Sequence, residues 1–309
     1  MFMHGLWKWN WADSHRPLLS ISGHNITVGA DDINRDVNPI HAHRPAMQGG
    51  YVYAYGLKSQ LDAPGEYHID AKAAKLSFLP PEGASSGSYS VSRLYSAVVA
   101  RGASDITFEG LEIRYARGPG VKIDDSKNVV LKSCTVSNHG MMGVNVTGGS
   151  GCGVQASEVA GNGDAGVVLS GGDRISLTPS KHFVNNCTVH HNHRWIMMFS
   201  PDVLLAGVGQ SVTDSEIYGS PHFAVCECNN VASCTHSVRY VRGRHVAALQ
   251  SRSAPNTRHC LQSTRGTTTR WTTATCTTPA DSARTARRST RAGRGPTVAA
   301  VSSTRSSPA

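Results

Sequence analysis

The sequence predicts an all-β protein: a right-handed parallel β-helix with coils of about 23 residues, preceded by an N-terminal antiparallel β module. Glycines and apolar residues recur at one constant spacing through the middle of the chain. Within each repeat, apolar residues alternate with polar ones in three short bursts, which is the period of a strand. Composition agrees, since 31 of 309 residues are glycine and only 6% are aromatic. Such a chain favours thin repeated layers over a large interlocking core.

The repeat is carried by several independent columns of residues. Gly120, Gly143 and Gly166 are evenly spaced along the chain. The same spacing relates Leu111, Cys134 and Ser157, then Ile113, Val136 and Val159, then Ile106, Val129 and Cys152. Three strands in so short a repeat leave no room for crossover helices. Each strand is therefore expected to pair with its counterpart in the next coil, about 4.8 Å away, in the right-handed sense usual for parallel connections.

Longer coils and a different upstream region set the domain boundaries. The interval from Val159 to Val189 exceeds the regular repeat, which places an insertion in SGGDRISLTPSK, and the next coil has a second insertion in FSPDVLLAGVGQS. Upstream, two alternating runs, Tyr67–Asp70 and Lys75–Leu79, predict an antiparallel hairpin ended by two prolines. Trp7, Trp9 and Trp11 alternate as on one face of a strand, and a plain hydrophobic strand explains them more simply than a sugar-stacking platform. We predict a β module over 1–95, coils over 96–228 and a tail over 229–309.

The tail differs in charge from the rest of the chain. Residues 232–309 contain 13 Arg, no Lys and one acid, which leaves 17 basic and 20 acidic residues for the first 231. A basic nucleic-acid-binding arm, a disordered linker and translation in the wrong reading frame all fit this composition. Lysine neutralises phosphate as well as arginine does, so its exclusion favours wrong-frame translation of GC-rich DNA. We expect a disordered tail and no nucleic-acid partner.

The sequence shows no membrane span, signal peptide or zinc-knuckle motif. No apolar run approaches the ~18 residues that a membrane span needs, and the first residues lack the features of a signal peptide. The cysteines at 226, 228 and 234 lack the spacing of a zinc knuckle. Alternate histidines His191 and His193 could share a ligand face, but no carboxylate lies nearby in sequence. We predict no metal site and no cofactor.

Candidate site residues gather on one long side of the predicted coils. Lys122 and Asn145 face outward from successive coils, and the turns beside that column carry further polar residues. A groove lined with His, Arg, Asn and Asp suits a polar sugar chain, and hydrolysis of such a chain requires two carboxyl groups that flank the glycosidic bond. Asp173, beside Arg174 in the first insertion, is the leading catalytic candidate, because an adjacent guanidinium favours the ionised form; a loop-clamping role explains it nearly as well. Asp164 and Asp214 follow as catalytic candidates, and the predicted substrate-binding residues are Arg174, His191, Arg194, His222, Asn145 and Lys122.

The runs HGLWKWNWADS, LDAPGEYHIDAKAAKLSFLPPEG, SGGDRISLTPSK and GVG at Gly207–Gly209 resemble bacterial right-handed parallel β-helix proteins related to glycoside hydrolase family 141. The resemblance covers roughly residues 1–225. It implies an extracellular or periplasmic enzyme that acts on polysaccharide side chains. Members of that family begin with a signal peptide and further coils and continue past the position of Val225. The resemblance therefore implies that this chain is a fragment, with weak or no turnover.

The function predicted from these observations is a carbohydrate-active β-helix, most simply part of a glycoside hydrolase that acts on a polysaccharide or oligosaccharide. One alternative is a polysaccharide lyase, in which Lys122 or Arg117 would be the base, often with calcium. Another is a non-catalytic carbohydrate-binding or structural β-helix. The complete protein is expected to be a monomer with no membrane partner.

Overall fold

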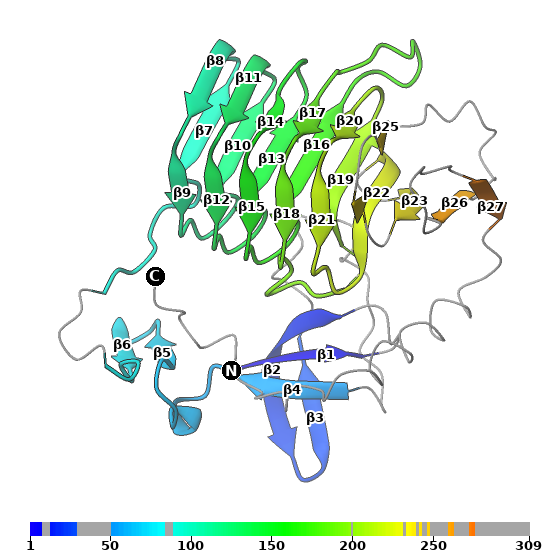
Figure 1. Cartoon of the computed structure of the whole chain (residues 1–309). Coiled ribbons are helices and arrows are strands. Elements are labelled where there is room, and N and C mark those ends of the chain that lie inside the picture. Colours follow the sequence, from blue (N-terminus) through cyan, green and yellow to red (C-terminus); the bar gives the residue numbers. More distant parts are fainter. Residues whose placement is uncertain are drawn as a thin grey trace. The chain divides into compact units, whose positions relative to one another are not determined.

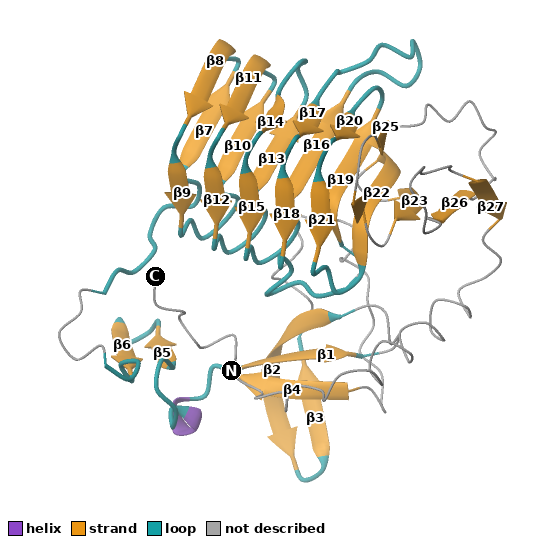
Figure 2. Ribbon diagram, viewed as in Figure 1, coloured by secondary structure: helices purple, strands orange, loops and turns teal. Residues whose placement is uncertain are grey.

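The structure is a computed structural model, and it describes residues 1–7, 13–29, 51–83, 89–198, 200–230, 233–238, 241–242, 246–247, 259–262 and 272–275. These residues fall into two compact units, one within 1–91 and one within 92–276. Figures 1 and 2 show that strands dominate both units. The helical segment of the described residues is one short turn, η2 (Lys58–Gln60), so none of their helices could span a membrane.

The first unit contains a four-stranded antiparallel sheet and a separate hairpin. The sheet has the order β3-β2-β1-β4, with β1 (Phe2–Leu6), β2 (Ser14–Ser22), β3 (Asn25–Val28) and β4 (Tyr51–Tyr55). Gly23, at φ +57°, makes the tight β2–β3 turn without the steric cost that a side chain would bring. The hairpin pairs β5 (Tyr67–Asp70) with β6 (Lys75–Phe78). The predicted antiparallel module and its hairpin are confirmed.

Trp7 follows β1 and is buried, and its indole N–H donates to the Ser14 carbonyl oxygen at 2.9 Å. The hydrogen bond satisfies the polar edge of a ring that otherwise packs as a hydrophobe. This supports a structural role for the first tryptophan. Trp9 and Trp11 lie outside the described residues.

The second unit is a right-handed parallel β-helix, as predicted, with three parallel sheets along its sides (Figure 1). The first sheet contains β7 (Val98–Arg101), β10 (Val121–Asp124), β13 (Val144–Thr147), β16 (Val167–Gly171), β19 (Pro201–Gly207) and β22 (Phe223–Asn230). The second contains β8 (Ser104–Glu109), β11 (Lys127–Lys132), β14 (Gly153–Gln155), β17 (Phe183–Asn185) and β20 (Ser211–Thr213). The third contains β9 (Glu112–Arg114), β12 (Thr135–Ser137), β15 (Glu158–Ala160), β18 (Thr188–His190) and β21 (Glu216–Tyr218).

The pairing register reproduces the columns expected from the sequence. Val121 pairs with Val144, and Val144 with Val167, while Val129 pairs with Ile106. The inward members of these columns form one continuous core of valine, isoleucine, leucine and cysteine. Each fully buried aliphatic side chain contributes about 1.5–3 kcal/mol to folding. Stacking of coils is therefore what stabilises such short strands.

Two predicted core residues, Ile106 and Leu111, are 37% and 42% exposed. Both lie in the first coil, whose strands β7, β8 and β9 are at the ends of the three sheets. Such a coil has a neighbour on one side only. The column assignment is correct, and the exposure reflects the position of the coil in the stack.

Polar residues at the corners bond from coil to coil. The Ser157 hydroxyl accepts the Cys134 N–H, and the side-chain carbonyl oxygen of Asn162 accepts the His139 N–H, each across 23 residues. These bonds satisfy backbone groups that leave the sheets at the corners. The sequence repeat therefore specifies the turns as well as the core.

Three short strands beyond β22 lie within the predicted tail. β23 (Ser233–Val238) pairs antiparallel with β22, β24 (Val241–Arg242) with β21, and β25 (Val246–Ala247) with β20. A hairpin of β26 (His259–Gln262) and β27 (Thr272–Thr275) follows. The last coil leaves unpaired N–H and C=O groups on all three sheets, and these strands pair with them. The disordered tail stays a prediction, and the other residues of the tail lie outside the described ones.

Candidate functional site

The structure distributes the predicted site residues over several separate positions. Lys122 and Asn145 pair in register on the outward face of the first sheet, as predicted. The ammonium of Lys122 lies 3.3 Å from the Asp124 carboxylate on the same strand. Asp164 lies in the turn before β16, whereas Asp173 and Arg174 lie in the insertion after it. The strand between them spans about 13 Å, so Asp164 and Asp173 are too far apart to flank one glycosidic bond.

Asp173 is exposed, and its described hydrogen bonds lie within its own loop. Its carboxylate accepts the Ile175 N–H at 2.9 Å and the Ser176 hydroxyl at 2.6 Å. The Ser176 hydroxyl is the main cause that lowers the pKa of Asp173. Arg174 donates instead to the Gly207 carbonyl oxygen, at 3.4 Å. These contacts fit a carboxylate that orders the insertion, and a catalytic role for Asp173 stays a prediction.

The other predicted residues occupy exposed or half-buried turns. Asp214 lies in the turn between β20 and β21, in the left-handed region at φ +50°. His191, also left-handed, is exposed, with its Nδ1 2.8 Å from Nδ1 of His190. Arg194 donates to the Asn138 side-chain oxygen at 3.2 Å. The half-buried His222 packs edge-on against the Phe223 ring. The contacts described for His191, Arg194 and His222 are with residues other than Asp173.

Asp164 instead belongs to a buried cluster that the sequence did not predict as a unit. Asp164, His193 and Asp202 are 1%, 2% and 0% exposed. Nδ1 of His193 lies 3.9 Å from the Asp164 carboxylate, and Nε2 lies 3.6 Å from the Asp202 carboxylate. The imidazole therefore has a different carboxyl group on each side. We name Asp164, His193 and Asp202 the acid–histidine cluster.

Neighbouring polar groups orient the two carboxyls. The Ser200 hydroxyl donates to Asp164 Oδ1 at 2.6 Å, and the Asn192 amide donates to Asp202 Oδ1 at 2.8 Å. Burial raises the pKa of Asp202 from 3.8 to about 7, more than the Asn192 hydrogen bond lowers it. Asp202 is thus half protonated near neutral pH, while an exposed aspartate would be fully ionised.

A ladder of corner residues leads to the cluster. The Asn162 side chain accepts from His139 N–H, and both its backbone N–H and its side-chain amide donate to the Asn192 side-chain oxygen, at 3.2 and 2.8 Å. Asn192 in turn donates to Asp202. These hydrogen bonds fix the position of the Asp202 carboxyl at the end of a polar column. A side chain that takes part in a reaction needs such a fixed position.

The segment after β18 covers this corner of the coil. The backbone N–H groups of residues 193–196 donate to the carbonyl oxygens of Asp164, Asn162 and Gly163 at 2.8–3.1 Å. Nδ1 of His193 is 3.1 Å from the Ile196 carbonyl oxygen, and the Ile196 side chain is buried. We name residues 193–198 the covering segment.

Sequence reasoning missed Asp202, although a signal was present. Val167 pairs with Val203, so the residue before each of them occupies the same column. That column reads Gly120, Gly143, Gly166 and then Asp202. A carboxyl group at a position that is glycine in three other coils indicates that this position has a different role in the fourth. Reading the column across the insertion would have found it.

The part of the chain that the structure describes shows metal-ligand spacing elsewhere, in the N-terminal sheet. One ligand atom each from His4, Asp13 and His15 lies within 4.8 Å of the others. His191 and His193, considered together from the sequence, differ in environment, since the first is exposed and the second buried.

Comparisons with known proteins address the coils. Residues 88–237 match the sequence model of a family described as "Right handed beta helix region". No curated protein and no solved structure matches the chain. The match spans the three parallel sheets from β7 to β22, where pairing and repeat independently agree. This segment of the chain is a right-handed parallel β-helix.

Proposed function

We propose that the β-helix binds a polysaccharide and hydrolyses its glycosidic bonds, with Asp202 as general acid and Asp164 as its carboxylate partner. Right-handed β-helix regions are typical of carbohydrate-active enzymes, among other proteins. The observation that carries the proposal is the acid–histidine cluster. Two fixed carboxyl groups lie on opposite sides of one imidazole, and one of them stands at a column position that is otherwise glycine.

The chemistry of the reaction requires two carboxyls in different protonation states. The acid gives a proton to the leaving glycosidic oxygen as the bond to the anomeric carbon breaks. The carboxylate either activates the water that attacks this carbon or attacks it directly. A pKa of about 7 keeps much of Asp202 protonated at neutral pH, which suits the acid. The Ser200 hydroxyl donates to Asp164 and fixes the orientation of its carboxyl group.

The substrate reaches these carboxyls only if the covering segment moves. Its contacts with the corner of residues 162–164 include four backbone hydrogen bonds, whose net contribution is about 1 kcal/mol each. Opening at this cost is compatible with turnover, because loops that close over substrates are common in enzymes. Arg194 is exposed at the start of the segment, and Lys122 and Asn145 are partly exposed on the neighbouring coils. These side chains would contact hydroxyl or carboxylate groups of the sugar chain.

A finer assignment belongs to the same proposal. The motif resemblance supports a relative of glycoside hydrolase family 141 that acts outside the cytoplasm. It also supports the interpretation of the chain as part of a longer enzyme. The absence of Lys from residues 232–309, beside 13 Arg, supports wrong-frame sequence there. The encoding DNA, read in all three frames past codon 225, tests that part: a β-helix continuation in another frame supports it, and its absence overturns it.

A hydrolysis screen tests the activity. The tag-free chain is incubated with a panel of plant and microbial polysaccharides, and both reducing ends and ultraviolet-absorbing unsaturated products are measured. We expect reducing ends without unsaturated product, released slowly because the chain is proposed to be part of a longer enzyme. Asp202→Asn and Asp164→Asn should each lower kcat by about 10²–10⁴-fold. Asp105→Asn is the matched control, because it makes the same chemical change at an exposed aspartate of β8 and should keep the rate.

Three outcomes overturn the proposal. Unsaturated product identifies a lyase. Binding without turnover across the panel identifies a carbohydrate-binding module. An Asp202→Asn chain that melts like the wild type and keeps its rate removes Asp202 from the reaction.

A further inference from the structure

A second buried cluster of titratable side chains lies in the N-terminal sheet, and the strand register explains how it forms. His4 of β1 is directly opposite His15 of β2 and, on its other side, Tyr53 of β4. Directly opposed residues project from the same face of a sheet. Asp13 precedes His15 by two residues, and Tyr55 follows Tyr53 by two, so strand alternation places both on that face as well.

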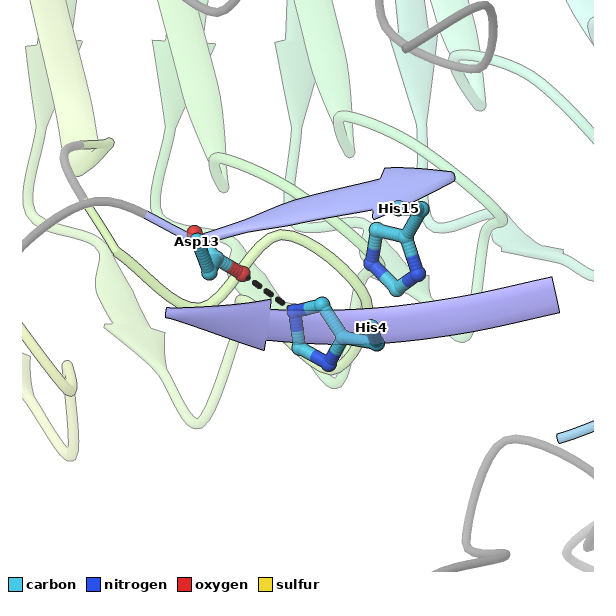
Figure 3. Close-up of side chains that lie close together, drawn as sticks. All are labelled: His4, Asp13 and His15. Atoms are coloured by element: carbon cyan, nitrogen blue, oxygen red, sulfur yellow. Dashed lines mark hydrogen bonds and ion pairs between the residues drawn. The ribbon is translucent and has the colours of Figure 1, made fainter. Parts of the chain in front are cut away.

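The contacts within the cluster are short and specific. Nε2 of His4 lies 2.7 Å from Asp13 Oδ2, and the His4 and His15 rings stack in parallel with centroids 3.9 Å apart. Figure 3 shows the Asp13 carboxylate and the two imidazoles converging between β1 and β2. All three residues are nearly inaccessible to solvent, at 3%, 3% and 1% exposure for His4, Asp13 and His15. A structure that buries three ionisable groups together must compensate the cost of removing them from water.

A tyrosine hydroxyl lies beside one ring nitrogen of each histidine. Nδ1 of His4 is 2.6 Å from the Tyr53 hydroxyl, and Nδ1 of His15 is 3.1 Å from the Tyr55 hydroxyl. Histidines that bind a metal through one nitrogen nearly always hydrogen bond through the other. With each Nδ1–H donated to a tyrosine oxygen, Nε2 is the nitrogen that would bind a metal ion.

We propose that His4, Asp13 and His15 bind one zinc ion that ties β1 to β2. One ligand atom from each residue already lies within 4.8 Å of the other two. Zinc binds imidazole nitrogen and carboxylate oxygen at about 2.0–2.2 Å, with the ligands at tetrahedral corners. Ligand atoms then lie roughly 3.3 Å apart, so the 2.7 Å His4–Asp13 hydrogen bond would open slightly as the ion replaces the shared proton. The two stacked rings would also turn toward a common point, because a metal ion lies in the plane of each imidazole that binds it.

The donor set is compatible with zinc rather than with calcium or magnesium, which prefer oxygen ligands. One carboxylate leaves the ion and its three ligands with a single positive charge. The Tyr53 and Tyr55 oxygens then accept the Nδ1–H groups, which strengthens both imidazoles as ligands. Three protein ligands leave a fourth position for a water molecule. The role that burial favours is structural, because ion binding then contributes directly to folding stability.

The test measures the metal content of the full-length, tag-free chain. The protein is incubated with zinc sulfate, desalted and analysed by mass spectrometry of the metal. We expect one zinc per chain in the wild type and none bound in His4→Gln, Asp13→Asn or His15→Gln. His24→Gln is the matched control, because His24 is an exposed histidine in the β2–β3 turn of the same sheet. This control should keep its zinc.

Two further measurements use the unaltered chain, so that a variant that fails to fold cannot decide the question. Removing the metal with a chelator should lower Tm by several degrees, and added zinc should restore it. Cobalt(II) in the emptied protein should give the visible absorption of a tetrahedral site. A wild type that takes up no zinc, a Tm unchanged by chelator and zinc, or equal zinc in the His15→Gln chain each overturns the proposal. The first two results identify the cluster as a hydrogen-bonded Asp–His–Tyr network, and the third places the zinc on surface histidines.

Discussion

The coils from Val98 to Ala160 and those from Gly161 to Tyr218 share one architecture but differ in what they bury. In the first set the repeat is 23 residues, and the interior columns are aliphatic or thiol. In the second set the repeat lengthens to 30 and 28 residues, and a corner buries two carboxyls and a histidine. The aliphatic columns continue beneath that corner unchanged. A β-helix can thus keep its core while longer coils bury ionisable groups at a corner.

The largest expected effect tests the regular coils. Leu131 is fully buried in the interior, whereas Leu111 is 42% exposed at the end of the stack. Leu131→Ala should lower the free energy of unfolding by about 2–5 kcal/mol because it leaves a cavity. Leu111→Ala should cost less than half as much. Urea denaturation of the two variants measures the difference, and equal losses would show that the stacked interior is not the source of stability.

Asp202 should make the inserted coils less stable as pH rises. Its pKa is about 7 when folded and 3.8 otherwise, so between these values the folded state holds the extra proton. The free energy of unfolding is therefore highest below about pH 4. It falls by about 4 kcal/mol as the pH rises through 7. Asp202→Asn should remove this loss, while Asp214→Asn keeps it. Denaturation across that pH range measures both, and identical profiles for the two variants would contradict the assignment.

His139 should act in the opposite direction in the regular coils. Burial lowers its pKa from 6.5 to about 4, so acidification protonates the unfolded chain first. The contribution of His139 to the free energy of unfolding is complete above pH 6.5. It decreases by about 3 kcal/mol as the pH falls to about 4.

Asp202 and His139 change the free energy of unfolding over overlapping pH ranges and in opposite directions. Their effects therefore partly cancel in the wild type and can be separated only in variants. The Asp202→Asn chain should become more stable from pH 4 to 6.5, and adding His139→Gln should flatten that rise. His191→Gln, at an exposed histidine, should leave the rise in place. A rise that survives His139→Gln would assign it to another group.

The smallest effect concerns the corners of the regular coils. Gly149 and Gly102 both have positive φ, +70° and +57°. A Cβ on Gly149 would overlap the Ser126 carbonyl oxygen, whereas a Cβ on Gly102 would meet no described atom within 4 Å. In both variants an alanine would adopt a left-handed backbone conformation, which lowers the free energy of unfolding by about 1–2 kcal/mol. Gly149→Ala should lose roughly 1–3 kcal/mol more by overpacking. Thermal melts that show equal losses would mean that the corners can relax.

The fold was predictable from the sequence because a β-helix pairs each residue with one a fixed distance along the chain. Val121, Val144 and Val167 reveal their contact by spacing alone. The end effects were not predictable in the same way. Ile106 belongs to the right column yet is exposed, and the strands after β22 pair antiparallel, which a parallel repeat does not indicate.

The candidate site was only partly predictable, because its members meet through insertions of different lengths. Asp164 was identified from its turn, but its partners His193 and Asp202 follow at spacings that do not match the regular repeat. The Asp173–Arg174 pair was convincing as neighbours in sequence, yet their described hydrogen bonds lead to different groups. Position in a column of the β-helix therefore predicted spatial neighbours better than adjacency along the chain did.

The central claim is that the inserted coils hold a carboxyl group that stays protonated near neutral pH. Carboxyl-carbon NMR of aspartate-labelled protein, titrated from pH 3 to 9, tests it most directly. One aspartate resonance should shift with a midpoint near pH 7, and this resonance should vanish in Asp202→Asn but persist in Asp214→Asn. If the resonance assigned to Asp202 instead titrates near pH 4, as an exposed aspartate does, the claim is contradicted.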